Sequence, residues 1–334
     1  MNKYLFFRTD RVGDFLLTSI ILKGIKRKEP FSEITVIASE KNYDFIETMS
    51  YVDKVLLFPK SFKEKKNFLK HINKENQFDY LIVTDRKDRS IIFSLFIKAK
   101  IKILNITKKF YFFLKLLPKI NILLDDEKKD LKIEVIKKNL NILKINFEKS
   151  DLNIFENELN NPNLIGNKKL FKDDFAIIHF DEKWFKKEYI NEYTDIRPTK
   201  NEFDFFIKEL INKLNKNIII TCGSINLSIH DELKDEFRKI DNNIYLKEIL
   251  GKKIFFINNQ DYINSCSLIK KSYYWIGCHG SFTHVASSFN VKILDIIELD
   301  RKNFYNTYTN HLNNYNYLPR EKFLILSKKI INFF

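Results

Sequence analysis

Short apolar runs alternate with amphipathic segments along the first half of the chain. The runs that predict buried strands are 4–8, 34–39, 54–58 and 80–84. Between them, apolar residues recur at helical spacing in 14–26, near 42–49, in about 61–75 and near 89–99. Strands joined by helices are typical of a parallel sheet with right-handed crossovers, so we predict an α/β domain here.

The same alternation returns after a polar stretch at 146–170, which is rich in Asn and Glu and contains Pro162. We predict an interdomain linker in this stretch. The later runs predict strands at 175–180, 217–223, 253–257, 273–277 and 291–297, and helices at 201–215, at 260–271 and from near Ser281. The predicted domains are therefore 1–160 and 170–334, two Rossmann-like halves that face each other across a cleft.

The composition adds a charge excess to this picture. The 334 residues include 58 Lys and Arg against 43 Asp and Glu, a net charge of +15. Such an excess favours an anionic partner, namely nucleic acid, anionic lipid or a phosphorylated substrate, although a Lys-rich composition by itself puts lysines on every surface. No nucleic-acid-binding motif or aromatic–basic repeat is present, so we expect no nucleic-acid partner.

The cysteines and the apolar runs bear on where the protein works. Cys222, Cys266 and Cys278 have no paired spacing and suit a reducing cytosol. No signal-peptide pattern or membrane span is recognisable, so we predict a soluble cytoplasmic protein. In "KKFYFFLKLLPKI", residues 108–120, Phe and Leu interleave with lysines. This stretch predicts peripheral contact with the inner face of the membrane, the alternative being an interdomain or core helix.

Candidate chemistry lies in the loops that follow predicted strands, because parallel sheets bind ligands at the carboxyl ends of their strands. These loops are 8–14, 84–90, 179–187 and 277–284. The last belongs to "GCHGSFTHVAS", in which Gly277 and Gly280 permit a tight turn before a helix whose first N–H groups would bind a diphosphate. The alternative is an ordinary capped helix whose His284 packs inward. A zinc site is not expected, because no second ligand cluster accompanies Cys278.

Four segments of the sequence resemble one family of enzymes. "FFRTDRVGDFLLTSIILKGIK" has a strand, an Arg and a loop ending in Gly-Asp before a helix. "SYVDKVLLF", "FDYLIVTDRKDRS" and "YYWIGCHGSFTHVASSFNVKILDI" follow in the same order along the chain. Together they are similar to glycosyltransferase family 9, the heptosyltransferase-like proteins of bacterial lipopolysaccharide core assembly. His279 stands where that family has an Asp.

The resemblance implies a GT-B fold, with the acceptor bound by the N-terminal domain and a nucleotide-sugar bound by the C-terminal one. The implied reaction is inverting transfer of a heptose or related sugar to a lipopolysaccharide or lipooligosaccharide core or another surface glycan, on a lipid-linked or oligosaccharide acceptor. It implies no cofactor and no metal, which fits the lack of an Asp-X-Asp motif. The alternatives are a nucleotide-sugar epimerase of the same fold and a catalytically silent nucleotide-sugar-binding protein.

The resemblance also implies roles for particular residues. Asp14 would be the catalytic base. The alternative is that Asp14 only caps its helix. On the acceptor side we expect Arg8, Asp10, Arg11 and Arg86. On the donor and phosphate side we expect Lys183, His279, Gly280, Ser281, Thr283 and His284.

Overall fold

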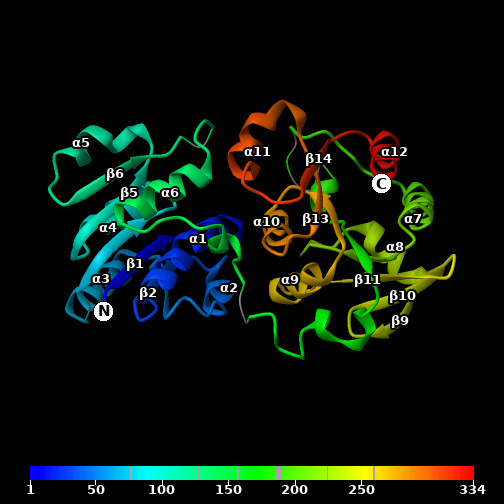
Figure 1. Ribbon diagram of the computed structural model, residues 1–334, viewed down its shortest axis with the longest axis horizontal. Helices are drawn as coiled ribbons and strands as arrows, with labels where there is room; N and C mark the ends of the chain where they lie inside the picture. The colour runs from blue at the N-terminus through cyan, green and yellow to red at the C-terminus, as the bar shows by residue number, and fades with distance from the viewer. Residues whose placement is uncertain are drawn as a thin grey trace. The chain divides into compact units, whose positions relative to one another are not determined.

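The computed structural model describes residues 1–75, 77–126, 128–155, 158–185, 190, 192–223, 225–258 and 260–334. The chain divides into two compact units (Figure 1). The first consists of Met1–Glu158 with Asn306–His311, and the second of Leu159–Tyr305 with Leu312–Phe334.

The first unit is built on a six-stranded sheet in which all neighbouring strands are parallel, in the order β3-β2-β1-β4-β5-β6. Its strands are β1 (Lys3–Arg8), β2 (Glu33–Ala38), β3 (Lys54–Leu57), β4 (Phe78–Val83), β5 (Ala99–Ile106) and β6 (Ile120–Leu124). Its helices are α1 (Val12–Lys28), α2 (Tyr43–Glu47), α3 (Phe62–Glu75), α4 (Asp88–Leu95), α5 (Tyr111–Lys115) and α6 (Lys132–Ile142).

Two predicted segments of the first unit differ from the structure. The helix predicted near 89–99 ends at Leu95, and β5 begins at Ala99, because one long apolar run contains both elements and its periodicity does not mark the boundary. The segment 108–120 forms neither an interfacial nor a core helix of that length. It contains a 3₁₀ turn (Lys108–Phe110), the short α5 and the first residue of β6.

The N-terminus of helix α1 follows the carboxyl end of β1, and contacts near the C-terminal end of the helix hold it in place. A Cβ on Gly24 would lie 3.0 Å from the side chain of Leu140 in α6, so the two helices approach closely at this glycine. Three residues further along α1, the Arg27 guanidinium lies 2.9 Å from the buried carboxylate of Asp151. These contacts fix α1 against the rest of the first unit.

The second unit contains an eight-stranded sheet in the order β14-β13-β12-β7-β8-β11-β10-β9, in which β9, β10 and β11 pair antiparallel and the other pairs are parallel. Its strands are β7 (Phe175–His179), β8 (Asn217–Thr221), β9 (Arg238–Asp241), β10 (Ile244–Ile249), β11 (Lys252–Ile257), β12 (Tyr274–Cys278), β13 (Lys292–Ile297) and β14 (Tyr315–Pro319). Its helices are α7 (Lys200–Leu214), α8 (Ser228–Glu236), α9 (Tyr262–Lys271), α10 (Ser281–Ser288), α11 (Lys302–Thr309), which runs into the segment grouped with the first unit, and α12 (Phe323–Phe333).

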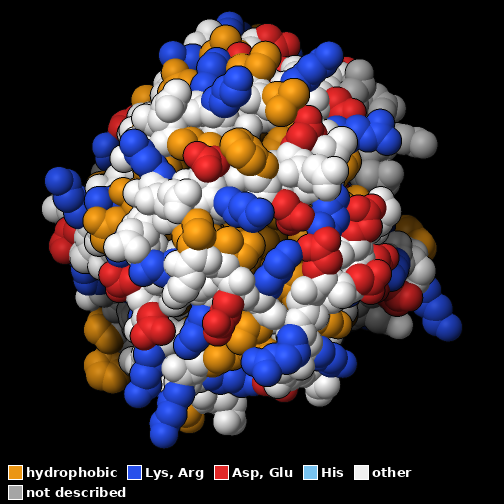
Figure 2. Space-filling model, turned by 90° about the vertical axis from the view of Figure 1, so that its right-hand side faces the viewer, with side chains coloured by type: hydrophobic (Ala, Val, Ile, Leu, Met, Phe, Trp, Pro, Cys, Tyr) orange, Lys and Arg blue, Asp and Glu red, His pale blue; other side chains and the backbone are white. Residues whose placement is uncertain are grey.

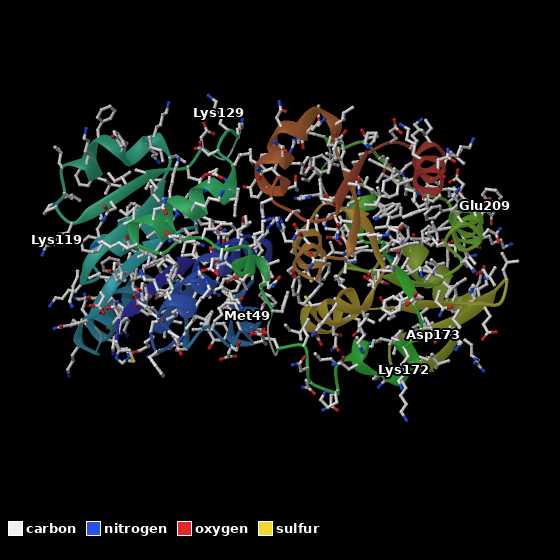
Figure 3. The ribbon with its side chains drawn as sticks, in the orientation of Figure 1. Met49, Lys119, Lys129, Lys172, Asp173 and Glu209 are labelled. Atoms are coloured by element: carbon white, nitrogen blue, oxygen red, sulfur yellow. The ribbon has the colours of Figure 1, made fainter. Side chains whose placement is uncertain are left out.

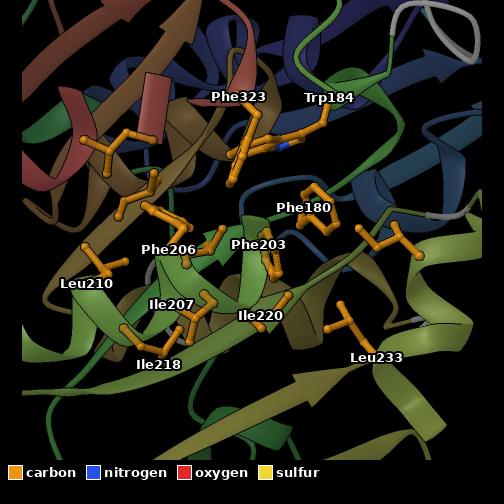
Figure 4. Packing of buried hydrophobic residues seen from close by; sticks show 14 of the residues in the cluster. Phe180, Trp184, Phe203, Phe206, Ile207, Leu210, Ile218, Ile220, Leu233 and Phe323 are labelled. Atoms are coloured by element: carbon orange, nitrogen blue, oxygen red, sulfur yellow. The ribbon is translucent and has the colours of Figure 1, made fainter. Parts of the chain in front are cut away.

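An aromatic core supports the loop that follows β7. Phe180 stacks on Phe203 of α7 with ring centroids 4.5 Å apart, and Trp184 packs beside Phe323 of α12 (Figure 4). The indole N–H of Trp184 donates to the carbonyl of His179 over 2.9 Å. The loop between these aromatic residues is therefore held rigidly at the carboxyl end of the strand.

The surface carries charges of both signs. On the face drawn in Figure 2, Lys and Arg side chains are interspersed with Asp and Glu. Among the described residues, none of the helices is long and apolar enough to cross a membrane.

Candidate active site

Arg8 joins the carboxyl ends of β1 and β4 to the start of α1. Its guanidinium is buried and donates to the carbonyl of Thr84 and to the backbone carbonyl of Asp14, each over 2.6 Å. The same group lies 3.2 Å from the Asp10 carboxylate and 3.5 Å from that of Asp14. Arg8 therefore sets the positions of both carboxylates, and its predicted place on the acceptor side stays a prediction.

Asp14 is the third residue of α1, and its side chain is 31% exposed. Arg11 is exposed at the N-cap position, and no side chain provides a cap hydrogen bond to this helix. Asp14 is the acidic residue in the first turn of α1, so both the base role and the capping alternative remain predictions. Its carboxylate borders a groove together with Asp10 and Arg11.

Asp10 is the more buried of the two carboxylates. Burial, and then the charges of Asp14 and Asp85, raise its pKa from 3.8 to about 6 against the opposing effect of Arg8. Asp85 is itself buried and accepts hydrogen bonds from the backbone N–H and hydroxyl of Thr9. Three acidic groups thus meet at the carboxyl ends of β1 and β4.

The raised pKa of Asp10 predicts a pH dependence of stability. A carboxyl whose pKa is higher in the folded than in the unfolded state favours folding below its unfolded value of 3.8, and this contribution is lost as the pH rises through 6. We expect the unfolding free energy of Asp10→Asn, relative to the natural protein, to rise by about 2–3 kcal/mol between about pH 4 and pH 7. Urea denaturation of both proteins across this range measures the difference. Parallel pH curves would contradict the prediction.

Cations outnumber acids along the groove beside Asp14. Its lining includes six Lys and Arg residues against three carboxylates, those of Asp10, Asp14 and Glu40. The six cations are Arg11, Lys41, Lys60, Lys65, Lys87 and Arg89. An excess of positive charge around a carboxylate suits a ligand that carries anionic groups.

Arg86 borders a second, smaller pocket that Arg8 and Asp14 also border. Its guanidinium lies 3.5 Å from the carboxylate of Asp125, which in turn lies 2.5 Å from the ammonium of Lys132. Asp125 and Lys132 are both buried. The sequence patterns missed this pair because they did not predict β6 or α6, the elements that carry it.

In the second unit, the partly exposed Lys183 forms an ion pair with a buried carboxylate just after β7. Its ammonium lies 2.8 Å from the carboxylate of Asp181, whose other neighbour is the His179 ring at 3.2 Å. Although burial disfavours the charge on Lys183, Asp181 raises the pKa of this ammonium above its ordinary value. Burial likewise opposes ionisation of Asp181, but Lys183 and His179 hold the pKa of its carboxyl well below the usual range. Both groups are charged at neutral pH.

The Lys183 ammonium lies against the N-terminus of α10. A Cβ on Gly280 would lie 2.7 Å from Nζ of Lys183, so the ammonium is close to the Gly280 backbone and a side chain there would displace it. Arg320, which follows β14, donates to the backbone carbonyl of Lys183 and fixes the loop from behind. The N–H groups of Ser281 and Phe282 precede the first helical hydrogen bond of α10 and are available to an anion.

His279 and Thr283 are tied to one buried carboxylate. Nδ1 of His279 donates to Asp295 over 2.6 Å, and Asp295 also accepts from the hydroxyls of Thr283 and Tyr315 at 3.1 and 3.0 Å. The Thr283 hydroxyl accepts the N–H of Gly280 as well, so it is used within the loop. We therefore assign Thr283 a positioning role rather than the predicted contact with the donor.

The remaining predicted residues differ in exposure. Ser281 is half-buried at the first position of α10. His284 is buried one turn later and its ring contacts that of His279, as the inward-packing alternative predicts. Within the described parts of the chain, no three His, Cys, Asp or Glu residues form a group that could hold a metal ion.

Sequence reasoning missed three residues that shape the second-unit site, namely Asp181, Asp295 and Arg320. Asp181 comes two residues after the end of β7. Its position in a loop that follows a predicted strand could have identified it as a candidate site residue. Asp295 lies within the apolar run of β13, and a buried Asp in such a run needs a partner. Arg320 is separated from its partner Lys183 by 137 positions in the sequence, so no local sequence pattern reveals their contact.

Two Rossmann-like units, each with polar groups at the carboxyl ends of parallel strands, define the GT-B class of fold. Several glycosyltransferase structures are similar to this chain. The family 9 glycosyl transferase from Veillonella parvula has a TM-score of 0.66 at 15% identity, over 95% of this chain and 86% of that one. The E. coli heptosyltransferase WaaC with ADP-2-deoxy-2-fluoro heptose has a TM-score of 0.66 at 9% identity, over 99% of this chain and 100% of that one.

A third similar structure is an epimerase. The UDP-GlcNAc 2-epimerase from Methanocaldococcus jannaschii has a TM-score of 0.53 at 16% identity, over 99% of this chain and 92% of that one. No family model matches the sequence, and no curated protein matches it either. The predicted α/β, GT-B fold and the resemblance to glycosyltransferase family 9 are thus confirmed at the level of the fold.

Proposed function

We propose that this protein is an inverting glycosyltransferase, which moves a heptose or related sugar from a nucleotide-sugar to a surface-glycan acceptor. The observation that carries the proposal is the position of the Lys183 ammonium, which lies against Gly280 at the start of α10. A cation beside the N–H groups of a helix N-terminus is suited to a diphosphate. The fold shared with a heptosyltransferase that was solved with an ADP-sugar supports this choice of donor.

The proposed reaction is a single displacement at the anomeric carbon of the donor sugar. The acceptor oxygen forms a bond to that carbon while the bond from the carbon to the diphosphate oxygen breaks. The Asp14 carboxylate takes the proton of the acceptor hydroxyl. The departing nucleoside diphosphate carries its negative charge to Lys183 and to the N–H groups of Ser281 and Phe282. The bonds, the proton and the charge of this displacement are all accounted for without a cofactor, and we expect no metal.

The acceptor side of the proposal rests on the groove of the first unit. Asp14 borders that groove, and the surrounding cations favour an acceptor with anionic groups. A lipopolysaccharide or lipooligosaccharide core, lipid-linked or as an oligosaccharide, has this chemistry. We expect the transfer to occur in the cytoplasm of a bacterium, where nucleotide-sugars are made.

A nucleotide-sugar panel tests the proposed function. We expect one nucleotide-sugar to raise the melting temperature of the protein, because a ligand that binds only the folded state stabilises it. With that donor, an acceptor glycan should cause release of nucleoside diphosphate and formation of a glycoside of inverted configuration. Epimerised nucleotide-sugar in the absence of acceptor would favour the epimerase instead. Binding without either product would identify a silent binding protein.

A further inference from the structure

The segment between β5 and β6 keeps three large apolar side chains in solvent. Phe112 is 82% exposed, Phe113 is 61% exposed and Leu116 is 84% exposed. Leu114, in the middle of this segment, is buried in the core of the first unit, and Leu117 packs against the same core. The segment is therefore anchored through one face while its opposite face is also apolar.

This exposed face is not a by-product of helix packing. One apolar face is enough to hold a surface helix on its domain, and polar residues normally occupy the other. Here Phe112 and Phe113 lie in α5 and Leu116 directly follows its last residue, so three exposed apolar side chains fall within five residues. Large apolar side chains gathered in solvent in this way mark an interaction site.

Lysines surround the apolar face, and acidic residues are absent from this part of the sequence. Lys108, Lys109, Lys115 and Lys119 are all exposed. Lys119 lies at the outer edge of the first unit, and Figure 3 labels it there. No Asp or Glu occurs in the sequence between Asp88 and Asp125. The face therefore combines apolar tips with an excess of positive charge.

We propose that this surface docks the first unit on an anionic lipid surface. The α5 patch is defined as Phe112, Phe113 and Leu116 together with the four lysines 108, 109, 115 and 119. Aromatic and aliphatic side chains enter the boundary between headgroups and acyl chains, while lysine ammonium groups remain with the lipid phosphates. Helix α5 has only five residues, so the contact is peripheral.

Charge complementarity favours a membrane over a second copy of the chain. Two copies joined through the α5 patch would bring eight lysines together, and like charges oppose such an interface. An anionic leaflet attracts each of these lysines instead.

The α5 patch begins at the edge of the sheet that carries the acceptor groove. Lys108 follows the last residue of β5, Ile106, by two positions, and this is the same carboxyl edge at which Arg8 ends β1. The Lys109 ammonium lies 2.5 Å from the carboxylate of Asp88, which begins α4. If the proposed function holds, docking here brings the groove to a lipid-linked acceptor. The docking itself does not depend on that reaction.

Vesicle flotation of the full chain, without donor or acceptor, tests the docking. We expect the protein to float at low salt with vesicles that contain phosphatidylglycerol, and to stay at the bottom with phosphatidylcholine alone. The combined substitutions Phe112→Ser, Phe113→Ser and Leu116→Ser should lower the partition coefficient roughly tenfold or more. A Lys→Ser change at Lys108, Lys115 or Lys119 should lower it about fivefold, since a lysine near an anionic leaflet contributes about 1 kcal/mol. The change at Lys109 should have a smaller effect, because Asp88 already pairs with its ammonium.

A matched control lies on α3 of the same unit. Phe62 is 84% exposed, and Lys63 and Lys66 are exposed nearby. Changing these three residues to Ser removes one exposed Phe and two Lys, the same groups that the α5 variant Phe112→Ser, Lys108→Ser and Lys115→Ser removes. Flotation should fall in this α5 variant and should not change in the α3 control. All variants should keep the melting temperature of the natural protein, because the substituted side chains are exposed.

Four outcomes would overturn the docking proposal. They are a protein that stays at the bottom with anionic vesicles, equal binding to neutral vesicles, an equal loss in the α3 control, and a dimer in solution that the α5 variant abolishes. None of these readouts involves glycosyl transfer. Failure of the docking is therefore distinct from failure of the proposed function.

Discussion

Replacing Asp14 by Asn is expected to lower the rate of glycosyl transfer by about 10² to 10⁴-fold, the usual contribution of a general base. Asn has nearly the shape of Asp but does not accept the proton of the acceptor hydroxyl. The carboxylate of Asp14 borders the cationic groove, and Arg8 holds it in place from behind. Transfer is measured as release of nucleoside diphosphate with the donor that the panel identifies.

The fold and the donor affinity should survive the Asp14→Asn substitution. No side-chain cap hydrogen bond to α1 is lost, and the bond from Arg8 to the Asp14 backbone carbonyl does not involve its carboxylate. The proposed donor contacts, Lys183 and Gly280, belong to the other unit. We therefore expect the melting temperature and the dissociation constant of the donor to stay close to those of the natural protein.

Asp10→Asn is the matched control, because Asp10 shares both the loop and the Arg8 partner but is more buried. Its effect on transfer should be smaller than that of Asp14→Asn. Near-normal transfer by a folded Asp14→Asn protein would remove Asp14 from the base role. A larger loss in Asp10→Asn than in Asp14→Asn would assign that role to Asp10, whose pKa of about 6 also suits a base near neutral pH.

The sequence predicted most of the central strands of both sheets and the edge strand β3, but missed the edge strands β6, β9 and β14 and the inner strands β5 and β10. Strands such as β1, β2 and β7 are buried through most of their length and read as unbroken apolar runs. The edge strand β9 has the sequence RKID, and β14 at the other edge has YNYLP. Edge strands are half-exposed and carry polar residues, so hydrophobic periodicity does not distinguish them from loops.

For the candidate site, the sequence predicted where the polar residues lie but not which of them form ion pairs or hydrogen bonds with one another. The rule that ligands bind after parallel strands singled out the loops that hold Asp14, Lys183 and the start of α10, while the roles of the individual residues came from the family resemblance. It did not indicate that Asp181 neutralises Lys183, or that His279 is bound to Asp295. These pairings depend on how loops and neighbouring strands pack, and that information is spread along the whole chain.

The ion pair between Lys183 and Asp181 decides how the donor site is best tested. Removing Lys183 alone leaves the Asp181 carboxylate, which is 2% exposed, without its closest cation. Breaking a buried pair in this way typically destabilises a protein by about 3–5 kcal/mol, so Lys183→Ala is expected to lower stability as well as donor binding. A fall in donor affinity in that variant alone would not separate the two effects.

The combined change of Lys183→Met with Asp181→Asn removes both charges and keeps similar volumes. We expect this double variant to recover most of the stability lost by Lys183→Ala but to bind the donor about ten- to a hundredfold more weakly, because a charge-assisted contact contributes about 1.5–3 kcal/mol. Asp181→Asn alone keeps the ammonium beside Gly280 and should keep its donor affinity. Titration calorimetry gives the affinities, and thermal melts give the stabilities. A double variant that binds the donor as tightly as the natural protein would exclude Lys183 from the diphosphate site.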